Sequence, residues 1–367
     1  MLGYLFRILI VYVDLYTDIP VFNSGSDTEY YHDEGIQYMK YGYTSGIDNN
    51  YDLFLGIIYT ITDGSRLFAQ YLNVLMGTGT ILILMNLLKM FNVPLKRIKL
   101  IAFASTFMPM LIINSSILLR EAWIEFFLLL SLYWFSKWFL CNGSVGAIVM
   151  SVVCVFLSSW MHAGCFFVFI GYFLAFITYN RRKGRVMFSR SSISAIFILS
   201  LLLLVFIANI GVLGKKISGA FTDFDPGFIS ERAEGDPGGG STYLTWLPLT
   251  YSYVDFIYLP IRMFYFIFSP IPTDWRGLND FIGFIIDSSI YIWLFCHIII
   301  GKSRNKKEIL LCRYLLIAIF LVVVVFSIGT FQSGNAMRHR AKVVPMLFFI
   351  YSLKYKKKEL LKVDFHG

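Results

Sequence analysis

The sequence predicts an all-α polytopic membrane protein, and three observations support this fold class. The chain has 367 residues, of which 57% are hydrophobic and only 15% are charged, and its mean hydropathy is +0.66. Soluble domains are about one quarter charged, so a soluble fold is excluded. Apolar runs of membrane-spanning length recur along the chain. The Lys and Arg residues behind the net charge of +9 lie mostly between these runs, which is typical of topology signals and not of nucleic-acid binding.

The apolar runs predict about ten transmembrane helices in one polytopic domain, residues 1–367. A span needs about 20 apolar residues. Runs that reach or approach this length cover residues 65–91, 98–118, 121–140, 144–160, 162–180, 191–213, 281–300, 309–330 and 338–354. The first run, residues 2–13, is too short for a full span, so it is either a short tilted helix or part of a longer one.

Positive charge predicts that both termini are inside the cell. Basic clusters occupy residues 96–99, 181–190, 302–307 and 356–358, and cytoplasmic loops carry an excess of Lys and Arg. All four clusters lie inside if residues 246–270 do not cross the membrane. This apolar segment is interrupted by Pro248, Asp255, Pro260, Arg262 and Pro270. We therefore expect a re-entrant or interfacial segment on the outer side, where irregular backbone must be buried in protein or face water.

Two long loops are expected outside. The first, residues 14–64, is acidic and contains a short apolar stretch, Tyr51–Ile61, that is expected to form an interfacial helix. The second, residues 214–280, contains the segment 246–270 and a Pro-Gly-Gly-Gly run at 237–240 that is expected to act as a hinge. A mobile loop above an outer cavity would be a suitable lid.

An ionisable pair, Arg120-Glu121, lies between two apolar runs at the end of the stretch Asn114–Glu121. A charge is costly at bilayer depth, so this pair is a candidate functional site. Glu125 lies one helical turn after Glu121 on the same face, which places a second carboxylate inside the apolar run and favours function. The alternative is a helix-end pair, with Glu121 at the helix N-terminus and Arg120 reaching the headgroups.

A second cationic cluster, Arg338–Lys342, opens the last apolar run. On the predicted topology the outer face receives Arg120, His162, Arg262, Arg276, Arg338, His339 and Arg340. The guanidinium fork matches phosphate oxygens, and several forks from different helices suit a pyrophosphate whose charge grows as it departs. The predicted pyrophosphate ligands are Arg120, Arg338, Arg340 and Arg262. Headgroup anchoring is the alternative, and the positive-inside bias argues against it.

The candidate bases are carboxylates and imidazoles. Residues 25–35 are dense in carboxylates and contain Asp27 and His32, either of which could accept a proton from an incoming hydroxyl. The alternative is an ordinary solvated loop. His162, which opens a predicted helix, is a further catalytic candidate, or else a satisfied helix-end residue. The spacing of these residues fits no metal-ligand pattern, so no metal site and no cofactor are predicted.

Three segments resemble, in order, motifs of bacterial polysaccharide polymerases of the EpsG/Wzy type. Gly25–Tyr31 (GSDTEYY) is similar to the Gly-x-Asp-Thr-x-x-Tyr stretch that follows the first helix of those proteins. Asn114–Glu121 resembles their helix-junction motif, and Gly334–Arg340, followed by Pro345, resembles their late Arg-x-Arg motif. The likeness extends over most of the chain, although each motif is short. The short first helix departs from the pattern.

The resemblance implies a glycosyltransferase of the GT-C class at the outer face of the bacterial inner membrane. Such an enzyme transfers the growing glycan from undecaprenyl pyrophosphate to the non-reducing end of a new lipid-linked unit, for O-antigen, capsule or exopolysaccharide. Its expected partners are the lipid-linked oligosaccharides, a chain-length regulator and a flippase. It needs no nucleotide sugar. In this hypothesis Arg120, Arg338 and Arg340 clamp the pyrophosphate, Glu121 orients Arg120, and Asp27 or His32 activates the acceptor.

Three other classes remain as alternatives. A lipid-linked glycan flippase or transporter would carry polar residues through the bilayer midplane, whereas the charges here gather at one face. A membrane-bound acyltransferase would need a buried His with a partner, and only His162 and His297 are candidates. A GT-C transferase that uses a polyprenyl-phosphate sugar donor would have a similar site with one phosphate fewer.

Overall fold

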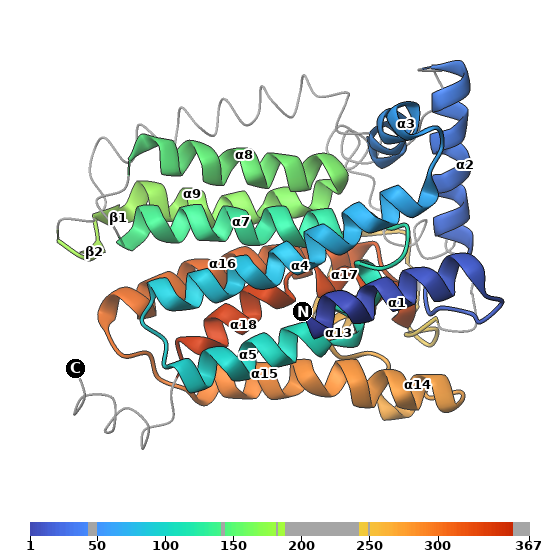
Figure 1. Cartoon of the computed structure of the whole chain (residues 1–367). Helices are drawn as coiled ribbons and strands as arrows, with labels where there is room; N and C mark the ends of the chain where they lie inside the picture. The colour runs from blue at the N-terminus through green and yellow to red at the C-terminus, as the bar shows by residue number, and fades with distance from the viewer. Residues whose placement is uncertain (43–49, 141–143, 181–182, 188–241, 249, 355–367) are drawn as a thin grey trace.

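The computed structural model describes residues 1–42, 50–140, 144–180, 183–187, 242–248 and 250–354, and almost all of its regular structure is helical (Figure 1). The predicted run 191–213, the hinge at 237–240 and the basic cluster 356–358 lie outside these residues. The helices up to residue 178 are α1 Leu2–Tyr16, α2 Ser26–Tyr41, α3 Asn50–Thr62, α4 Arg66–Met90, α5 Leu95–Phe107, α6 Pro109–Asn114, α7 Glu121–Leu140, α8 Val145–Met161, η1 Ala163–Phe166 and α9 Phe167–Thr178.

A short antiparallel pair of strands follows, β1 Tyr179–Asn180 and β2 Arg185–Val186, in which Tyr179 faces Val186. The remaining helices are η2 Tyr253–Tyr258, α13 Leu259–Phe268, η3 Pro272–Asp274, α14 Leu278–Gly283, the π-helical turn η4 Phe284–Ser288, α15 Ser289–Ile300, α16 Lys306–Ile328, α17 Ser333–Ala341 and α18 Val344–Ser352.

Four helical segments of the described chain are long and apolar enough to cross a membrane: α4, α7, α16 and the continuous segment Asp280–Ile300. Two shorter apolar helices, α8 and the segment Ala163–Thr178, accompany them. In Figure 1 these helices run alongside one another, and α7 packs between α4 and α8. The described structure is that of an all-α protein with several apolar helices, and the total of ten spans stays a prediction.

Two predicted spans are interrupted. The run 98–118 divides into α5 and α6 at Pro109, which lacks the N–H needed to continue a helix and instead occupies the first turn of α6. The run 338–354 divides into α17 and α18, and Pro345 likewise lies in the first turn of α18. Counting apolar residues predicted two continuous helices here. Each predicted span is instead two shorter helices. The chain around these breaks places charged residues inside the bundle, namely Arg120-Glu121 between α6 and α7 and the basic residues of α17.

The outer loop predicted at 14–64 contains two helices. The apolar stretch Tyr51–Ile61 falls within α3, as expected for a helix, and buries Leu55 and Tyr59 against its surroundings. The acidic stretch before it, predicted as loop, forms α2. In Figure 1 α2 stands across the right-hand ends of the long helices, and it packs against α3. The predicted interfacial segment 246–270 forms η2 and the ten-residue α13.

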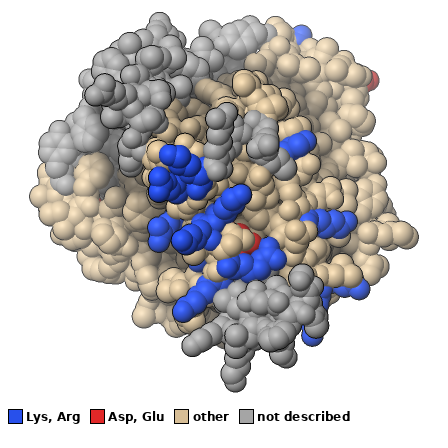
Figure 2. Space-filling model, turned by 90° about the vertical axis from the view of Figure 1, so that its left-hand side faces the viewer, with Lys and Arg blue, Asp and Glu red and all other residues tan. Residues whose placement is uncertain are grey.

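The opposite end of the molecule is basic. Lys and Arg side chains gather on it, as Figure 2 shows. Its loops are tied to one another: Arg304 donates a hydrogen bond of 2.7 Å to the carbonyl oxygen of Phe91, and Arg97 donates one of 2.6 Å to that of Lys354. The bundle therefore has two chemically different ends, one basic and one capped by α2 and α3.

Candidate functional site

Arg120 and Glu121 lie on a tight turn between α6 and α7, and a buried amide holds this turn in place. The side-chain nitrogen of Asn73 in α4 donates to the carbonyl oxygens of Ile117 at 2.8 Å and Leu119 at 2.9 Å. Its oxygen accepts from the indole N–H of Trp123 at 2.8 Å. These bonds satisfy carbonyl groups that leave the helical ladder, which is costly when they are buried and unpaired. Asn73 therefore fixes where the Arg-Glu pair points.

The Asn-Ser-Ser part of the motif also supports the turn. Asn114 donates to Glu125 at 3.1 Å, and the hydroxyl of Ser115 accepts from Nε of Arg7 at 2.7 Å. Arg7 and Glu125 are each 1% exposed. Arg7 lies in α1 and also donates to the carbonyl oxygen of Gly3 in the same helix, so its bond to Ser115 attaches α1 to the turn through one buried side chain. The second carboxylate, Glu125, thus accepts a hydrogen bond from Asn114. This contact gives Glu125 a structural role, the support of the turn.

Three distant segments meet in one ionic cluster. Arg338 of α17 pairs with Asp27 at the start of α2, and its Nε lies 3.4 Å from Oε1 of Glu121. The ammonium nitrogen of Lys342 lies 3.4 Å from the same oxygen. Glu121 is 1% exposed and Lys342 is wholly buried, whereas the side chain of Asp27 is 45% exposed. We call Asp27, Glu121, Arg338 and Lys342 the ionic cluster.

Two imidazoles and Arg120 adjoin the ionic cluster. Nζ of Lys342 lies 2.7 Å from Nδ1 of His339, and the ring of His162 is centred 5.2 Å from that of His339. Arg120 donates to the carbonyl oxygen of Met161 at 3.1 Å. His162 directly follows Met161 in the junction between α8 and η1, so the chain itself places Arg120 and His162 near each other. The predicted residues Asp27, Arg120, Glu121, His162 and Arg338 therefore share one region.

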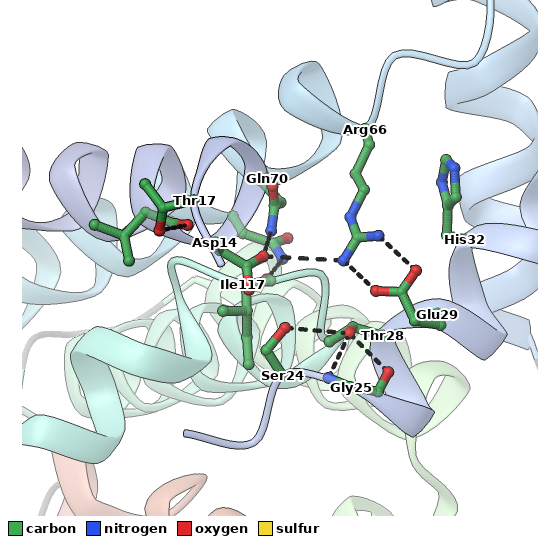
Figure 3. A network of polar contacts seen from close by, with 12 residues as sticks. Asp14, Thr17, Ser24, Gly25, Thr28, Glu29, His32, Arg66, Gln70 and Ile117 are labelled. Atoms are coloured by element: carbon green, nitrogen blue, oxygen red, sulfur yellow. Dashed lines mark hydrogen bonds and ion pairs between the residues drawn. The ribbon is translucent and has the colours of Figure 1, made fainter. Parts of the chain in front are cut away.

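His32 lies elsewhere, in the network that fastens α2 to the bundle (Figure 3). Its Nδ1 is 2.8 Å from the hydroxyl of Tyr59 in α3. Arg66 of α4 donates two hydrogen bonds of 2.8 Å to the carboxylate of Glu29, which lowers the pKa of Glu29. Burial lowers the pKa of His32, and Arg66 adds to this effect, so the neutral imidazole is favoured. His32 contributes to the support of α2, and no contact in the described structure joins it to the ionic cluster.

The Gly-Ser-Asp-Thr sequence forms the first turn of α2, and two of its residues have a clear role in that turn. Gly25 has a φ of 139°, a backbone conformation that favours glycine. The N–H of Gly25 donates to the hydroxyl of Thr28 at 3.0 Å, which closes the first turn of the helix (Figure 3). Asp27 is thereby held in the first turn of α2, where a carboxylate is also favoured by the helix dipole.

Arg340 belongs to a separate bridge. Its Nε donates to Asp287 at 2.9 Å, one terminal nitrogen pairs with Asp287 and donates to Ser288 at 3.0 Å, and the other donates to the carbonyl oxygens of Phe266 and Ile267 at 3.2 and 2.8 Å. These bonds use all five N–H donors of the guanidinium. Arg340 is 1% exposed and Asp287 is fully buried. A guanidinium saturated in this way has no donor left for a phosphate.

Arg262 is also placed apart from the ionic cluster. It lies in α13, is 2% exposed, and stacks on the ring of Phe331 at 5.1 Å from guanidinium carbon to ring centre. Of the four predicted pyrophosphate ligands, the structure therefore groups Arg120 and Arg338 in one region, and it places Arg340 and Arg262 in different surroundings.

Sequence reasoning missed Asn73 and Asp287 and left Lys342 out of the predicted site. Asn73 and Asp287 are polar residues inside apolar runs, and such residues are functional or structural candidates by default, so this signal could have found both. Lys342 lies four residues after Arg338, which puts the two on the same face of a helix. Arg340 is only two residues from each of them, so it points to the opposite side of the helix.

The candidate site is a cluster of charged side chains at the meeting point of α2, α7 and α17. In the described residues, no group of three or more His, Cys, Asp or Glu side chains is arranged to hold a metal ion. The ionic cluster offers two cations beside one buried and one half-exposed carboxylate. No protein-family profile, curated protein or solved structure matches this chain.

Proposed function

We propose that the chain is a polysaccharide polymerase that joins lipid-linked oligosaccharide units. The observation that carries this proposal is the ionic cluster, which unites Asp27, Glu121 and Arg338. Each of these residues belongs to one of the three segments that resemble motifs of the EpsG/Wzy polymerases. The three segments are more than 90 residues apart in the chain, and the ion pairs bring one charged residue of each together, which a common task at this site would explain.

Arg338 and Lys342 are the proposed ligands of the donor pyrophosphate, with Arg120 beside them. Arg338 provides a planar fork and Lys342 a point charge, and Lys342 directly follows the last residue of α17, four positions after Arg338. Such preorganised cations stabilise a leaving group as its negative charge develops. Arg340 and Arg262 are not included, because Arg340 has no free donor and Arg262 stacks on Phe331.

Asp27 is the proposed base. Its carboxylate pairs with Arg338 and is still partly exposed, so an arriving pyrophosphate competes with Asp27 for that guanidinium. Asp27 is then released to accept the proton of the acceptor hydroxyl. The hydroxyl oxygen attacks the anomeric carbon, a new glycosidic bond forms, and the bond between the anomeric carbon and the pyrophosphate breaks. Undecaprenyl pyrophosphate leaves with the electron pair of that bond.

Glu121 has a different task from Asp27. It is almost fully buried between Arg338 and Lys342, so it keeps both cations in place when no substrate is bound. The role first expected for Glu121 was the orientation of Arg120. The distances to Arg338 and Lys342 support orientation of these two residues instead.

The proposed location is the bacterial inner membrane, with about ten spans in a GT-C-like fold and the site on the extracytoplasmic face. The direction of α7 supports this sidedness. It begins at Glu121 in the ionic cluster and is 20 residues long, which is about 30 Å of helix and the thickness of a bilayer core. Because the basic end is favoured inside, the cluster would lie outside. The proposed partners are lipid-linked oligosaccharides, a flippase and a chain-length regulator.

The test is the length distribution of the surface glycan in a deletion strain that carries the Arg338→Ala variant. We expect loss of all long chains, while a single repeat unit is still attached to its lipid and the variant protein is present at the normal level. The matched control is Lys99→Ala, which removes an exposed cation at the opposite end. Normal chain length in Arg338→Ala rejects the assignment. Loss of the single unit itself would instead indicate a transporter or a transferase that completes the unit.

A further inference from the structure

The basic end contains a groove that the proposed polymerase reaction does not use. Its volume is about 340 Å³, which lies in the range of ligand sites. It is lined by Gly301, Lys302, Ser303, Ile309, Cys312, Arg313, Leu316 and Lys354. Three of these side chains are cations, one is a hydroxyl, and the others are apolar or small. The groove therefore combines anion recognition with an apolar wall.

The walls of the groove are held by contacts outside it. The backbone of Lys354 is fixed because its carbonyl oxygen accepts from Arg97 at 2.6 Å and lies 3.2 Å from Nε2 of His297. A Cβ atom on Gly301 would lie only 2.7 Å from Cβ of Lys354, so the glycine allows this wall to close against α15. The groove is therefore a built feature of the junction between α15, α16 and the end of α18.

Arg313 has an unusual position. It lies on α16 seven residues after Lys306, about 10 Å along the helix axis, and it is exposed. In the described part of the chain its guanidinium has neither a hydrogen-bond partner nor an ion-pair partner. The neighbouring acid of α16, Glu308, is already held by Arg304 at 2.7 Å. An exposed guanidinium without an internal partner has its donors available for an external anion.

The apolar surface beside Arg313 continues along α16. Ile309 is 36% exposed, and further along the same helix Ile317 and Phe320 are 39% and 54% exposed. Residues 309, 313, 317 and 320 are three or four positions apart, so they form one stripe on the helix. A ligand that places a negative group at Arg313 would thus have an apolar path beside it in the direction of the bundle centre.

We propose that this groove binds the headgroup of an anionic phospholipid, with an acyl chain along the stripe of α16. Lys302, Arg313 and Lys354 would contact the phosphate, and Ser303 would donate a hydrogen bond to it. The three cations of the groove favour a negatively charged headgroup. The apolar stripe on α16 favours a lipid, which has an acyl chain, over a free phosphate. Basic pockets between helices on the cytoplasmic side of membrane proteins are suited to such headgroups. The lipid would brace the junction of α15, α16 and α18.

The test is native mass spectrometry of the full chain in detergent, with phosphatidylglycerol or phosphatidylcholine added. We expect retained adducts with phosphatidylglycerol, and about fivefold weaker binding in Arg313→Gln, since one cation at a membrane surface contributes about 1 kcal/mol. The matched control is Lys99→Gln, an exposed cation at the same end but outside the groove, which should bind normally. Ile309→Ser should also weaken the adduct, because it shortens the apolar wall.

Three outcomes overturn the proposal. They are equal loss of binding in the Lys99→Gln control, equal retention of phosphatidylcholine, and full competition by soluble glycerophosphate, which would indicate a free-phosphate site. Arg313→Gln removes an exposed side chain without internal partners, so its folding is checked by the thermal unfolding curve without lipid, which should match that of the unchanged protein. Anionic lipid should raise the unfolding temperature of the unchanged protein more than that of the variant.

Discussion

Arg338 and Arg340 are two residues apart on α17, yet their surroundings differ completely. Arg340 is buried and gives all five donors to Asp287, Ser288 and two backbone carbonyls. Arg338 contacts two carboxylates, one of which, Asp27, is partly exposed. Two residues on an α-helix point about 200° apart, so the same helix presents one arginine to each side.

The difference shows that the burial of its ion-pair partner determines whether a charged residue can bind a ligand. A saturated, buried ion pair connects helices and cannot exchange its partner without a large cost. A pair with one exposed member can exchange that member for a ligand at little cost, because solvent already screens it. Arg340 therefore serves the packing of α17 against α13 and η4, and Arg338 is the arginine suited to bind substrate.

The largest expected effect on stability belongs to Arg340→Ala. It leaves Asp287 buried without its partner and should lower the free energy of unfolding by about 3–5 kcal/mol. Unfolding in detergent measures this loss. The double variant Arg340→Met with Asp287→Leu removes both charges and should recover most of it. An equal loss in Arg338→Ala would remove the distinction between the two arginines.

Glu121→Gln should have the next largest effect. It removes the charge that Arg338 and Lys342 share and should lower the free energy of unfolding by about 2–3 kcal/mol. Adding Lys342→Met removes one of the two cations left uncompensated, so the double variant should be more stable than the sum of the single effects. The polymer should be absent in both, since a pyrophosphate ligand is lost or misplaced. Simple additivity of the two changes would show that Glu121 and Lys342 are not coupled.

Much of the helical framework could be predicted from apolar length alone. The runs 65–91, 121–140 and 144–160 correspond closely to α4, α7 and α8. The breaks at Pro109 and before Pro345 could not be obtained in this way, because mean hydropathy does not register a missing N–H or a turn. The amphipathic helix α2 was missed for the opposite reason, because its acidic sequence has little hydropathy signal.

The candidate site was predicted in part. The polar motifs indicated Asp27, Glu121 and Arg338, and the fold brings these together. Arg340 was grouped with Arg338 because both belong to one short motif, although the helical period of 3.6 residues separates them and groups Lys342 with Arg338 instead. The partners of Arg340, Asp287 and two carbonyls of α13, lie 53 to 74 residues away and leave no local signal.

Asn73→Ala tests whether the turn that carries Glu121 is as important as the charges themselves. It removes the side-chain partner of the Leu119 carbonyl oxygen and of the Trp123 indole and leaves the Ile117 carbonyl oxygen with only the N–H of Leu119, and should cost about 1–2 kcal/mol of unfolding free energy. Because the turn shifts, we expect shorter glycan chains in the complemented deletion strain. Asn73→Asp keeps the acceptor for Trp123 but loses both donated bonds, so it should behave like Asn73→Ala in chain length.

The smallest expected effect on stability is that of Asp27→Asn. This variant distinguishes most clearly between the role of Arg338, which pairs with Asp27, and that of Arg340, which pairs with Asp287. Asp27 is half-exposed, so loss of its charge should change the free energy of unfolding by about 0.2–1 kcal/mol at most. If Asp27 is the base, polymer is nevertheless lost, because an amide cannot accept the proton of the acceptor hydroxyl. Asp287→Asn is the matched control at the other arginine: it should destabilise the protein strongly and reduce polymer only as far as the protein level falls. Normal chain length in Asp27→Asn would exclude Asp27 as the base and would leave the assignment of Arg338 as an anion ligand untouched.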